Sequence, residues 1–529
     1  MTEADITKSA PEDKLTSNLT LYFREYCQNS TIHGLKYLAS NEKRMWYERL
    51  WWICSIALSL FLCISLIMSI YIKWENSPII VSFATKETPI WQTPFPVLTI
   101  CPETKATPNK FNYHKFLLLN RENESIDPEN ETKFGLLSLL CNYDENINIK
   151  STFNGTPEDI IHFYEEVQPD FYKTISDCRF MGKRFNCREL FVPIFTEEGI
   201  CYSFNMLDRH DIYREKVVHY KNFGSTFPTN WSLEHGYPIR DKRGTYPFRA
   251  LFAGVVFALE AKLTVNESDL DYFCKSSIQG YKMEISHPSR VPRPKYDHIR
   301  IPLDQAIMAT LILDMMSTSK AVKNYNPRRR NCYMPNERPL NYFKIYTQQN
   351  CKLECLTNYT LNKCGCTTAY MPRENITRIC NGLDNHCVCL AEMDMLNASI
   401  DGHLLKLEGK QTSTECDCLP ICSKMNYIIQ SSQLNWNWAA EDSNYTKGKH
   451  MSMFQVFFKD NQFITSERNE LFGPIDFVAN LGGLLGLFIG FSMLSLIEIV
   501  YYITLRLIAN FNIFGRKYWA GNTVKENIC

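Results

Sequence analysis

Two long apolar segments near opposite ends of the chain constrain its fold more than any other feature. Leu50 to Ile72 contains no charged residue, and Phe477 to Leu505 contains a single one, Glu498. Both exceed the roughly 20 apolar residues that a helix needs to cross a bilayer. A signal peptide is the alternative for the first segment, but the polar residues 1–49 precede it and no small-residue cleavage site follows. We therefore expect two transmembrane helices.

Positive charges flank both segments on the sides away from the long middle region. They are Lys36, Lys43, Arg44 and Arg49 before the first segment, and Arg506, Arg516, Lys517 and Lys525 after the second. Because cytoplasmic flanks carry the excess of Lys and Arg, we predict a plasma-membrane protein with both termini in the cytoplasm. The expected domains are the cytoplasmic N-terminal tail 1–49, the first helix 50–72, an ectodomain 73–472, the second helix 473–505 and the cytoplasmic C-terminal tail 506–529.

Cysteines and glycosylation sequons both place the middle region outside the cell. Of the 21 cysteines, all except Cys27, Cys54, Cys63 and Cys529 lie between Cys101 and Cys422, as expected for disulfides in an oxidising compartment. Asn-x-Ser/Thr sequons between the two apolar segments occur at Asn123, Asn130, Asn154, Asn230, Asn266, Asn358, Asn375, Asn397 and Asn444. Asn18 and Asn29 also match, but this topology predicts that they stay unmodified.

Several classes of function are disfavoured. A zinc site is the alternative use of paired cysteines such as Cys351 and Cys355, but none of the pairs has the two-residue gap of zinc knuckles, so no metal or cofactor is expected. The 57 Lys+Arg balance the 57 Asp+Glu, which leaves no basic footprint for nucleic acid. Neither Gly-x-Ser-x-Gly nor His-Glu-x-x-His occurs, so we do not expect an enzyme.

Secondary structure in the ectodomain is expected to be mixed, an α+β fold. Short β-branched or aromatic stretches predict strands at Val97–Ile100, Cys201–Phe204, Tyr281–Ile285 and Met453–Phe458. Apolar residues near helical spacing predict a helix over Tyr342–Leu356, with the thiols of Cys351 and Cys355 one turn apart on the same face.

The second apolar segment has an unusual composition. Gly482, Gly486 and Gly490 recur every four residues, which places three side-chain-free positions on one helix face. Close helix packing is the simpler explanation, but Ser492 and Glu498 follow, and hydroxyls with exposed carbonyls can replace water around a small cation. A helix of this length would span about 43 Å, so an interruption is expected. Glu498 is either a pore carboxylate or a residue that reaches the lipid boundary.

Ordered motifs along nearly the whole chain resemble one family of channels. They are His33-Gly34, Phe95-Pro96-x-x-Thr99-Ile100-Cys101, Thr196 to Asn205, Trp231 to Tyr237, Arg330-Asn331-Cys332, the cysteine block from Cys351 to Cys422, and Gly482 to Ser492. Together they resemble the degenerin/epithelial sodium channel family, which includes the acid-sensing channels. The short tails and the cysteine block look most like the insect pickpocket branch.

The resemblance implies a fold and an activity. The expected fold is a trimer with two membrane helices per subunit and a large disulfide-rich ectodomain, with a β-rich palm and ball and a helical thumb and finger. The expected activity is a sodium-selective, amiloride-sensitive, voltage-independent cation channel gated through its ectodomain, in sensory or epithelial cells. The expected partners are membrane lipid, amiloride as blocker, and either identical subunits in a homotrimer or related subunits in a heterotrimer. The permeant ion would be Na+.

The resemblance also assigns roles to residues of the second apolar segment. Gly490, Phe491 and Ser492 would form the selectivity filter, and His33 with Gly34 a gating loop. Residues that line the pore or its vestibules would be Ala479, Asn480, Gly483, Gly486 and Glu498. Two departures weaken the analogy: Tyr501 stands where acid-sensing channels carry a second acidic residue, and Asn480 stands where an Asp is common.

The resemblance further implies disulfide pairs. They are Cys101–Cys201, Cys178–Cys187, Cys332–Cys422, Cys351–Cys418, Cys355–Cys416, Cys364–Cys387 and Cys366–Cys380. Cys141, Cys274 and Cys389 are left over, so either one thiol stays free or one of these pairs is wrong.

Three other classes of membrane protein share part of this pattern. An ATP-gated trimeric channel has the same two spans but fewer cysteines, an ectoenzyme needs a catalytic constellation, and an adhesion protein has no need for a glycine-rich span with a buried Glu.

Overall fold

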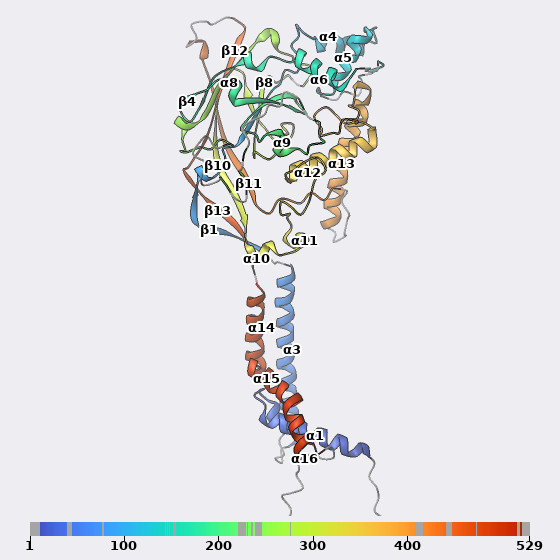
Figure 1. The fold of residues 1–529 in the computed structure, drawn as a ribbon, viewed down its shortest axis with the longest axis vertical. Helices are drawn as coiled ribbons and strands as arrows, with labels where there is room; N and C mark the ends of the chain where they lie inside the picture. Colours follow the sequence, from blue (N-terminus) through green and yellow to red (C-terminus); the bar gives the residue numbers. More distant parts are fainter. Residues whose placement is uncertain are drawn as a thin grey trace, which may run out of the picture. The chain divides into compact units, whose positions relative to one another are not determined.

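The computed structural model describes residues 11–39, 45–76, 79–142, 144, 147, 149–151, 155–218, 220, 229, 231–233, 236–237, 246–275, 277–407, 416–440, 447–471, 473–515 and 519–520. The chain forms two compact units, one made of residues 1–80 and 469–529 and the other of residues 81–468. Figure 1 shows the helices and strands of both.

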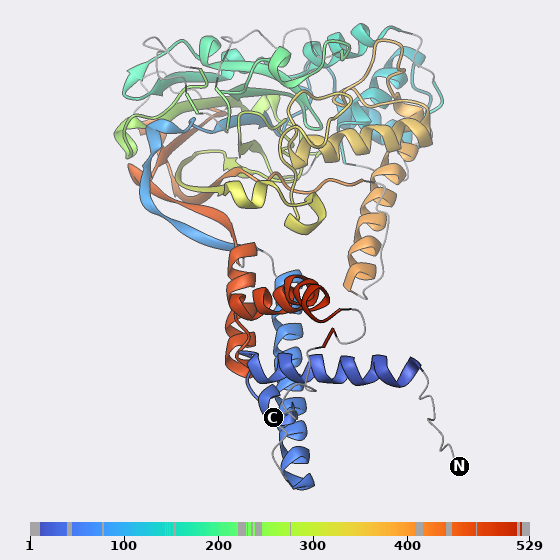
Figure 2. The ribbon, with the colours of Figure 1, turned by 60° about the horizontal axis from the view of Figure 1, so that its bottom comes forward.

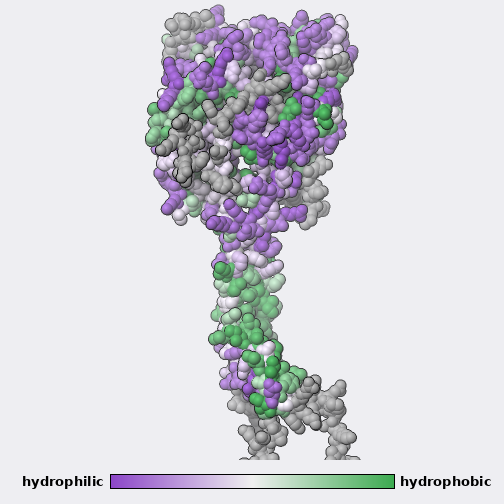
Figure 3. Space-filling model, viewed as in Figure 1, coloured by the Kyte–Doolittle hydropathy of each residue, from purple (hydrophilic) through white to green (hydrophobic). Residues whose placement is uncertain are grey.

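The first unit is helical. Its elements are α1 (Pro11–Asn29), α2 (Leu35–Ala39), α3 (Trp46–Asn76), α14 (Pro474–Ile489), α15 (Met493–Tyr501), a π-helical turn (Tyr502–Arg506) and α16 (Leu507–Phe514). Trp46–Asn76 and the continuous helical stretch Met493–Phe514 are long and apolar enough to cross a membrane, and Pro474–Ile489 is a shorter apolar helix. Figure 3 shows hydrophobic residues gathered over these helices. Apolar side chains such as Leu58 and Phe61 of α3 are 60% and 67% exposed, as expected for lipid-facing residues.

The boundaries of these helices differ from the predicted ones. α3 extends the first span at both ends, because Trp46, Tyr47, Trp74 and their neighbours continue the helix beyond the uncharged core. The second span is interrupted at residues 490–492, as predicted, but its helical structure continues to Phe514, past the predicted end at Leu505.

The second unit contains both sheets, so the expected α+β fold is confirmed. Among the described residues, an eight-stranded sheet has the order β1-β13-β10-β12-β7-β3-β4, with β11 paired to β10, and a five-stranded sheet has the order β5-β6-β2-β8-β9. The strands are β1 (Ile79–Pro89), β2 (Val97–Pro102), β3 (Ile175–Phe180), β4 (Lys183–Arg184), β5 (Phe191–Thr196), β6 (Gly199–Phe204), β7 (Leu259–Asn266), β8 (Gly280–Ser286), β9 (Ile299–Pro302), β10 (Gln305–Thr318), β11 (Lys424–Asn435), β12 (Lys449–Phe458) and β13 (Gln462–Glu470).

Short and long helices flank the sheets. They are α4 (Tyr113–Arg121), α5 (Pro128–Ser138), α6 (Pro157–Val167), α7 (Phe171–Thr174), α8 (Cys187–Leu190), α9 (Arg209–Ile212), α10 (Lys320–Lys323), α11 (Pro327–Arg330), α12 (Gln348–Cys364) and α13 (Asn385–Leu407), with 3-10 turns at Ile90–Gln92, Val255–Phe257, Glu267–Asp269, Gly382–Asp384 and Trp438–Ala440. Within this unit, α12 and α13 lie to one side of the sheets in both ribbon views (Figures 1 and 2).

The predicted strands all lie inside observed ones, but the helix predicted over Tyr342–Leu356 is wrong at both ends. The observed helix starts at Gln348, because the side chain of Thr347 caps it by accepting a hydrogen bond from the backbone N–H of Asn350. It continues to Cys364 and ends at Gly365, whose φ of +66° closes the helix.

Two motifs of the resemblance meet in the core between the sheets. Phe95 is fully buried, and its ring packs edge-on against Phe180, Phe204 and Phe458, with centroids 5.2, 6.0 and 5.5 Å away. The Asn205 amide donates to the carbonyls of Phe95 and Phe248 at 2.5 and 3.0 Å. These motif residues therefore hold together strands that are distant in sequence, so their role is structural.

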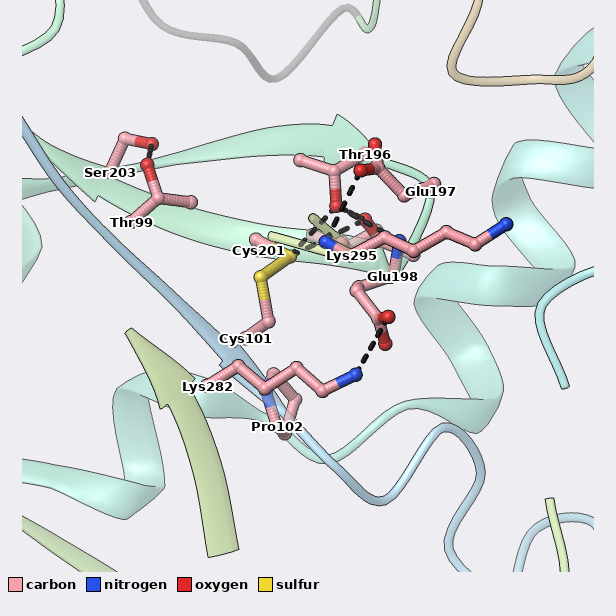
Figure 4. The surroundings of a disulfide bond; sticks show 12 residues. Thr99, Cys101, Pro102, Thr196, Glu197, Glu198, Cys201, Ser203, Lys282 and Lys295 are labelled. Carbon is pink, nitrogen blue, oxygen red and sulfur yellow. Dashed lines mark hydrogen bonds and ion pairs between the residues drawn. A yellow bond between two sulfur atoms is a disulfide. The ribbon is translucent and has the colours of Figure 1, made fainter. Parts of the chain in front are cut away.

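Disulfides join many elements of this unit. The structure has all seven pairs that the resemblance implies, and Cys141 and Cys274 form an eighth. Cys351 and Cys355 leave the same face of α12 toward Cys418 and Cys416. Figure 4 shows the Cys101–Cys201 disulfide between β2 and β6, beside the hydrogen bond that joins Thr99 and Ser203.

The turn between β5 and β6 is anchored by buried charge. The Glu198 carboxylate lies 2.7 Å from the Lys105 ammonium, 2.8 Å from that of Lys282 and 3.4 Å from that of Lys275, and its side chain is almost completely buried. Burial alone would raise its pKa, but the three lysines hold the pKa of Glu198 well below its usual range. The Glu198–Lys282 contact is visible in Figure 4.

Candidate functional site

The second span is interrupted at Gly490, Phe491 and Ser492, the three residues assigned to the filter. α14 ends at Gly490, which has a left-handed φ of +71°, and Ser492 is extended. α15 then starts with a capping box, because the Ser492 hydroxyl accepts from the backbone N–H of Ser495 at 3.3 Å and the Ser495 hydroxyl accepts from that of Ser492 at 3.1 Å. The capping box thus provides hydrogen-bond acceptors for two backbone N–H groups at the start of α15.

The predicted His-Gly loop lies against this interruption. The backbone N–H of His33 donates to the carbonyl of Ile489 at 3.0 Å. A Cβ atom built on Gly490 would lie 1.7 Å from His33 Nδ1, a distance that two atoms cannot share. Two independent constraints therefore favour glycine at position 490: its positive φ, and the His33 ring that fills the space of a Cβ atom.

Glu498 is held by the residues just before His33. Its Oε2 accepts from the backbone N–H of Thr31 at 3.2 Å and from the Thr31 hydroxyl at 3.0 Å. The same hydroxyl lies 2.8 Å from the hydroxyl of Ser495, which is fully buried. Glu498 is thus only partly exposed and is bonded to the N-terminal segment within its own chain.

The first span also contacts the interruption. The end of a helix leaves backbone carbonyls without intrahelical donors, and inside a bilayer water is not available to replace them. The Ser59 hydroxyl of α3 donates to the carbonyl of Phe488 at 2.6 Å. Donors from α3 and from the N-terminal loop therefore satisfy the carbonyls of Phe488 and Ile489.

The residues of α14 assigned to the pore share an uncovered face of this helix with Gly482. Ala479, Asn480, Gly482, Gly483 and Gly486 are all exposed within the described chain. A Cβ atom on Gly482 or Gly483 would meet nothing within 4 Å. The opposite face packs on α3, where the rings of Phe477 and Trp74 are stacked with centroids 5.3 Å apart. Packing against α3 therefore does not explain the glycines.

Predicted glycosylation sites lie where a glycan can attach. Asn123, Asn266, Asn375 and Asn397 are exposed, and Asn130 and Asn358 are partly exposed. Asn154, Asn230 and Asn444 lie outside the described residues.

Sequence reasoning missed Thr31, Ser59, Ser495 and the helix α1. The Ser-x-x-Ser spacing of Ser492 and Ser495 is a capping signal, and apolar residues at helical spacing between Leu15 and Tyr26 indicate α1. Thr31 and Ser59 carry no such signal, because their partners are hundreds of residues away.

Comparison with known proteins supports the resemblance to a sodium channel family that the sequence motifs indicate. A family model described as "Amiloride-sensitive sodium channel" matches residues 26–502. Pickpocket protein 28 of Drosophila melanogaster is 28% identical over 91% of this chain and 78% of its own length. Sodium channel protein Nach of the same species is 24% identical, over 92% and 88%. Acid-sensing ion channel 1C of Danio rerio is 23% identical, over 94% and 86%.

A solved structure, that of a proton-activated chloride channel, aligns with a TM-score of 0.29 and 9% identity over 86% of this chain and 96% of that one. The family model covers most of the chain, and its members are ion channels and not enzymes. The chain therefore belongs to the amiloride-sensitive sodium channel family.

Proposed function

We propose that this chain is a pore-forming subunit of a trimeric, sodium-selective and amiloride-sensitive channel in the plasma membrane, with both termini in the cytoplasm. The observation that carries the proposal is the interruption of the second span at residues 490–492, which the His33 loop supports by a hydrogen bond to the carbonyl of Ile489. An extended stretch inside a span is tolerated where it lines an ion pathway.

In this proposal each residue near the interruption has a role. Gly490, Phe491 and Ser492 are the selectivity filter, where backbone and hydroxyl oxygens replace the water of a sodium ion. Gly483 and Gly486 line the outer pore, Ala479 and Asn480 its mouth, and His33 with Gly34 supports the filter from the inside. Glu498 contributes a ring of carboxylates below the filter that concentrates cations.

A trimer places the uncovered face of α14 on the symmetry axis. Three copies related by a rotation close into a ring around this face, and the glycines let the backbones approach one another. The subunits are identical or belong to related chains, and membrane lipid covers the outward faces of α3 and α15.

The channel is voltage-independent in this proposal because its spans carry no row of gating charges. Leu50 to Ile72 has no charged side chain, and Glu498 is the single ionisable acid between Phe477 and Leu505. Gating then depends on the ectodomain, in sensory or epithelial cells.

The test is two-electrode voltage clamp on oocytes that express the chain with Ala479→Phe. A bulky residue on the axis should prevent closure, so we expect a standing inward current in sodium that disappears in a large impermeant cation and is blocked by amiloride. Val478→Phe is the matched control, because Val478 is exposed on a neighbouring face of the same helix and should give no standing current. Silence of Ala479→Phe despite surface biotinylation would refute a self-sufficient channel.

A further inference from the structure

The helix α1 packs on the end of the second span. Figure 2 shows α1 as the dark blue helix. The ring of Tyr26 lies 5.3 Å from that of Tyr502, and the ring of Tyr22 lies 5.5 Å from that of Trp519, measured between centroids. This aromatic cluster therefore joins the segment before the first span to the segment after the second.

A charge pair lies beside the aromatic cluster. The Arg506 guanidinium donates to Glu25 Oε1 through Nη2 at 2.7 Å and through Nε at 3.2 Å. The two side chains are 37% and 27% exposed, so solvent screens the attraction only in part. The two donated hydrogen bonds also fix the orientation of the planar guanidinium.

The contact falls on the π-helical turn Tyr502–Arg506. In a π-turn the hydrogen bonds span five residues instead of four, and such turns occur as interruptions of α-helices. The hydroxyl of Tyr22 donates to the backbone carbonyl of Tyr502. The π-turn thus contacts α1 at two points: the carbonyl of Tyr502 accepts from Tyr22, and Arg506 at the end of the turn pairs with Glu25.

This docking fixes the position of the loop that supports the filter. α1 ends at Asn29, where the backbone N–H of Ser30 donates to the carbonyl of Tyr26 at 2.8 Å, and Thr31 and His33 follow directly. Because so few residues separate α1 from His33, a displacement of α1 must move the backbone that contacts Ile489 and Glu498.

We propose that Tyr22, Glu25 and Arg506 form a latch that positions the His33 loop under Gly490, and so determines the ion selectivity of the channel. The inference rests on the proposed function. The three residues lie outside the proposed filter at residues 490–492, so they are positioning residues, and their effect should appear in a property of the filter.

The test uses charge reversal in the Ala479→Phe background. Glu25→Arg and Arg506→Glu each place like charges together, and we expect each to shift the reversal potential toward lower sodium-over-potassium selectivity and to reduce the standing current roughly threefold to fivefold. The double variant Glu25→Arg/Arg506→Glu restores an opposite-charge pair and should recover most of both properties. Glu25→Gln and Arg506→Gln, which add no repulsion, should give smaller shifts of the same sign.

Gln28→Arg is the control, since it introduces the same arginine side chain at an exposed position of α1 and should leave the reversal potential unchanged. Surface biotinylation corrects each current for expression. The latch is refuted if the single variants conduct at normal surface levels with an unchanged reversal potential, or if the double variant is no better than the singles, while Ala479→Phe still conducts. Silence of the Ala479→Phe parent at normal surface levels would instead refute a self-sufficient channel, and this inference about its filter with it.

Discussion

At the scale of single residues, Gly490 is the position where the structure leaves least freedom. Its φ of +71° disfavours any side chain, and the His33 ring occupies the space of a Cβ atom. We expect Gly490→Ala to reduce the sodium current of the Ala479→Phe background at least about tenfold, because the cost of the left-handed backbone adds to a displacement of His33. Whole-cell current normalised to surface protein measures the effect.

The control for this substitution is Val478→Ile, which adds one carbon at an exposed position on a neighbouring face of α14. It should conduct at a level close to its parent. Equal loss in both variants would show that α14 tolerates no added methyl group, and that His33 has no special relation to Gly490.

Glu284 gives the ectodomain a stability that depends on pH. It is fully buried, 3.4 Å from Arg290, and burial raises the pKa of its carboxyl to about 8. Because this pKa is higher in the folded than in the unfolded chain, the contribution to stability is complete at low pH and is lost as the pH rises through about 8. Between pH 6 and pH 9 the loss amounts to about 3 kcal/mol, nearly all of it below pH 8.

Thermal unfolding of the full-length protein in detergent tests this dependence. Glu284→Gln resembles the protonated carboxyl, so its melting temperature should fall less than that of the parent between pH 6 and pH 9. Glu122→Gln, at an exposed position after α4, should follow the parent. Parallel curves for Glu284→Gln and the parent would mean that Glu284 does not titrate in this range.

At the scale of elements, the interruption of the second span depends on donors from elsewhere in the chain. Ser59 donates to the carbonyl of Phe488, a bond worth about 1 kcal/mol or less within a membrane. Ser59→Ala should therefore change the sodium-over-potassium reversal potential in the direction of lower selectivity, with unchanged surface expression. Ser65→Ala, at an exposed position of α3, is the control, and an equal effect there would indicate a general change in the first span.

The elements also show what a sequence can and cannot predict. The interruption was predictable because the length of the apolar run and the glycine and serine residues within it are local signals. The start of α12 was not, because the cap at Thr347 competes with apolar residues that continue the helical spacing upstream. The bonds of Thr31 to Glu498 and of Ser59 to Phe488 have no local signal at all, since they form only when the two spans and the N-terminal segment come together.

The disulfides illustrate the same limit. Spacing alone indicates that cysteines pair, but it does not select a connectivity, and the seven pairs were available only through the resemblance. Cys141 and Cys274 are far apart in the chain and occur in none of the quoted motifs, so the eighth pair emerges only from the folded second unit.

At the scale of the whole molecule, the two units have opposite surface chemistry. Apolar side chains cover the helices of the first unit, and polar ones cover the second, which carries the disulfides and the sequons (Figure 3). A polar unit with eight disulfides belongs in an oxidising compartment, and an apolar one belongs in lipid. The proposed topology agrees with this division, and glycosylation can test it without any current measurement.

On that topology only sequons of the second unit meet the glycosylation machinery. Deglycosylation of the surface-expressed chain should lower its apparent mass, and Asn123→Gln, Asn266→Gln and Asn375→Gln, all at exposed positions, should each remove one step of that shift. Asn29→Gln should change nothing, although Asn29 is also exposed and fits the same sequon, because α1 then lies in the cytoplasm. A glycan on Asn29 would contradict this topology, and Glu25 and Arg506 would then face the outside of the cell.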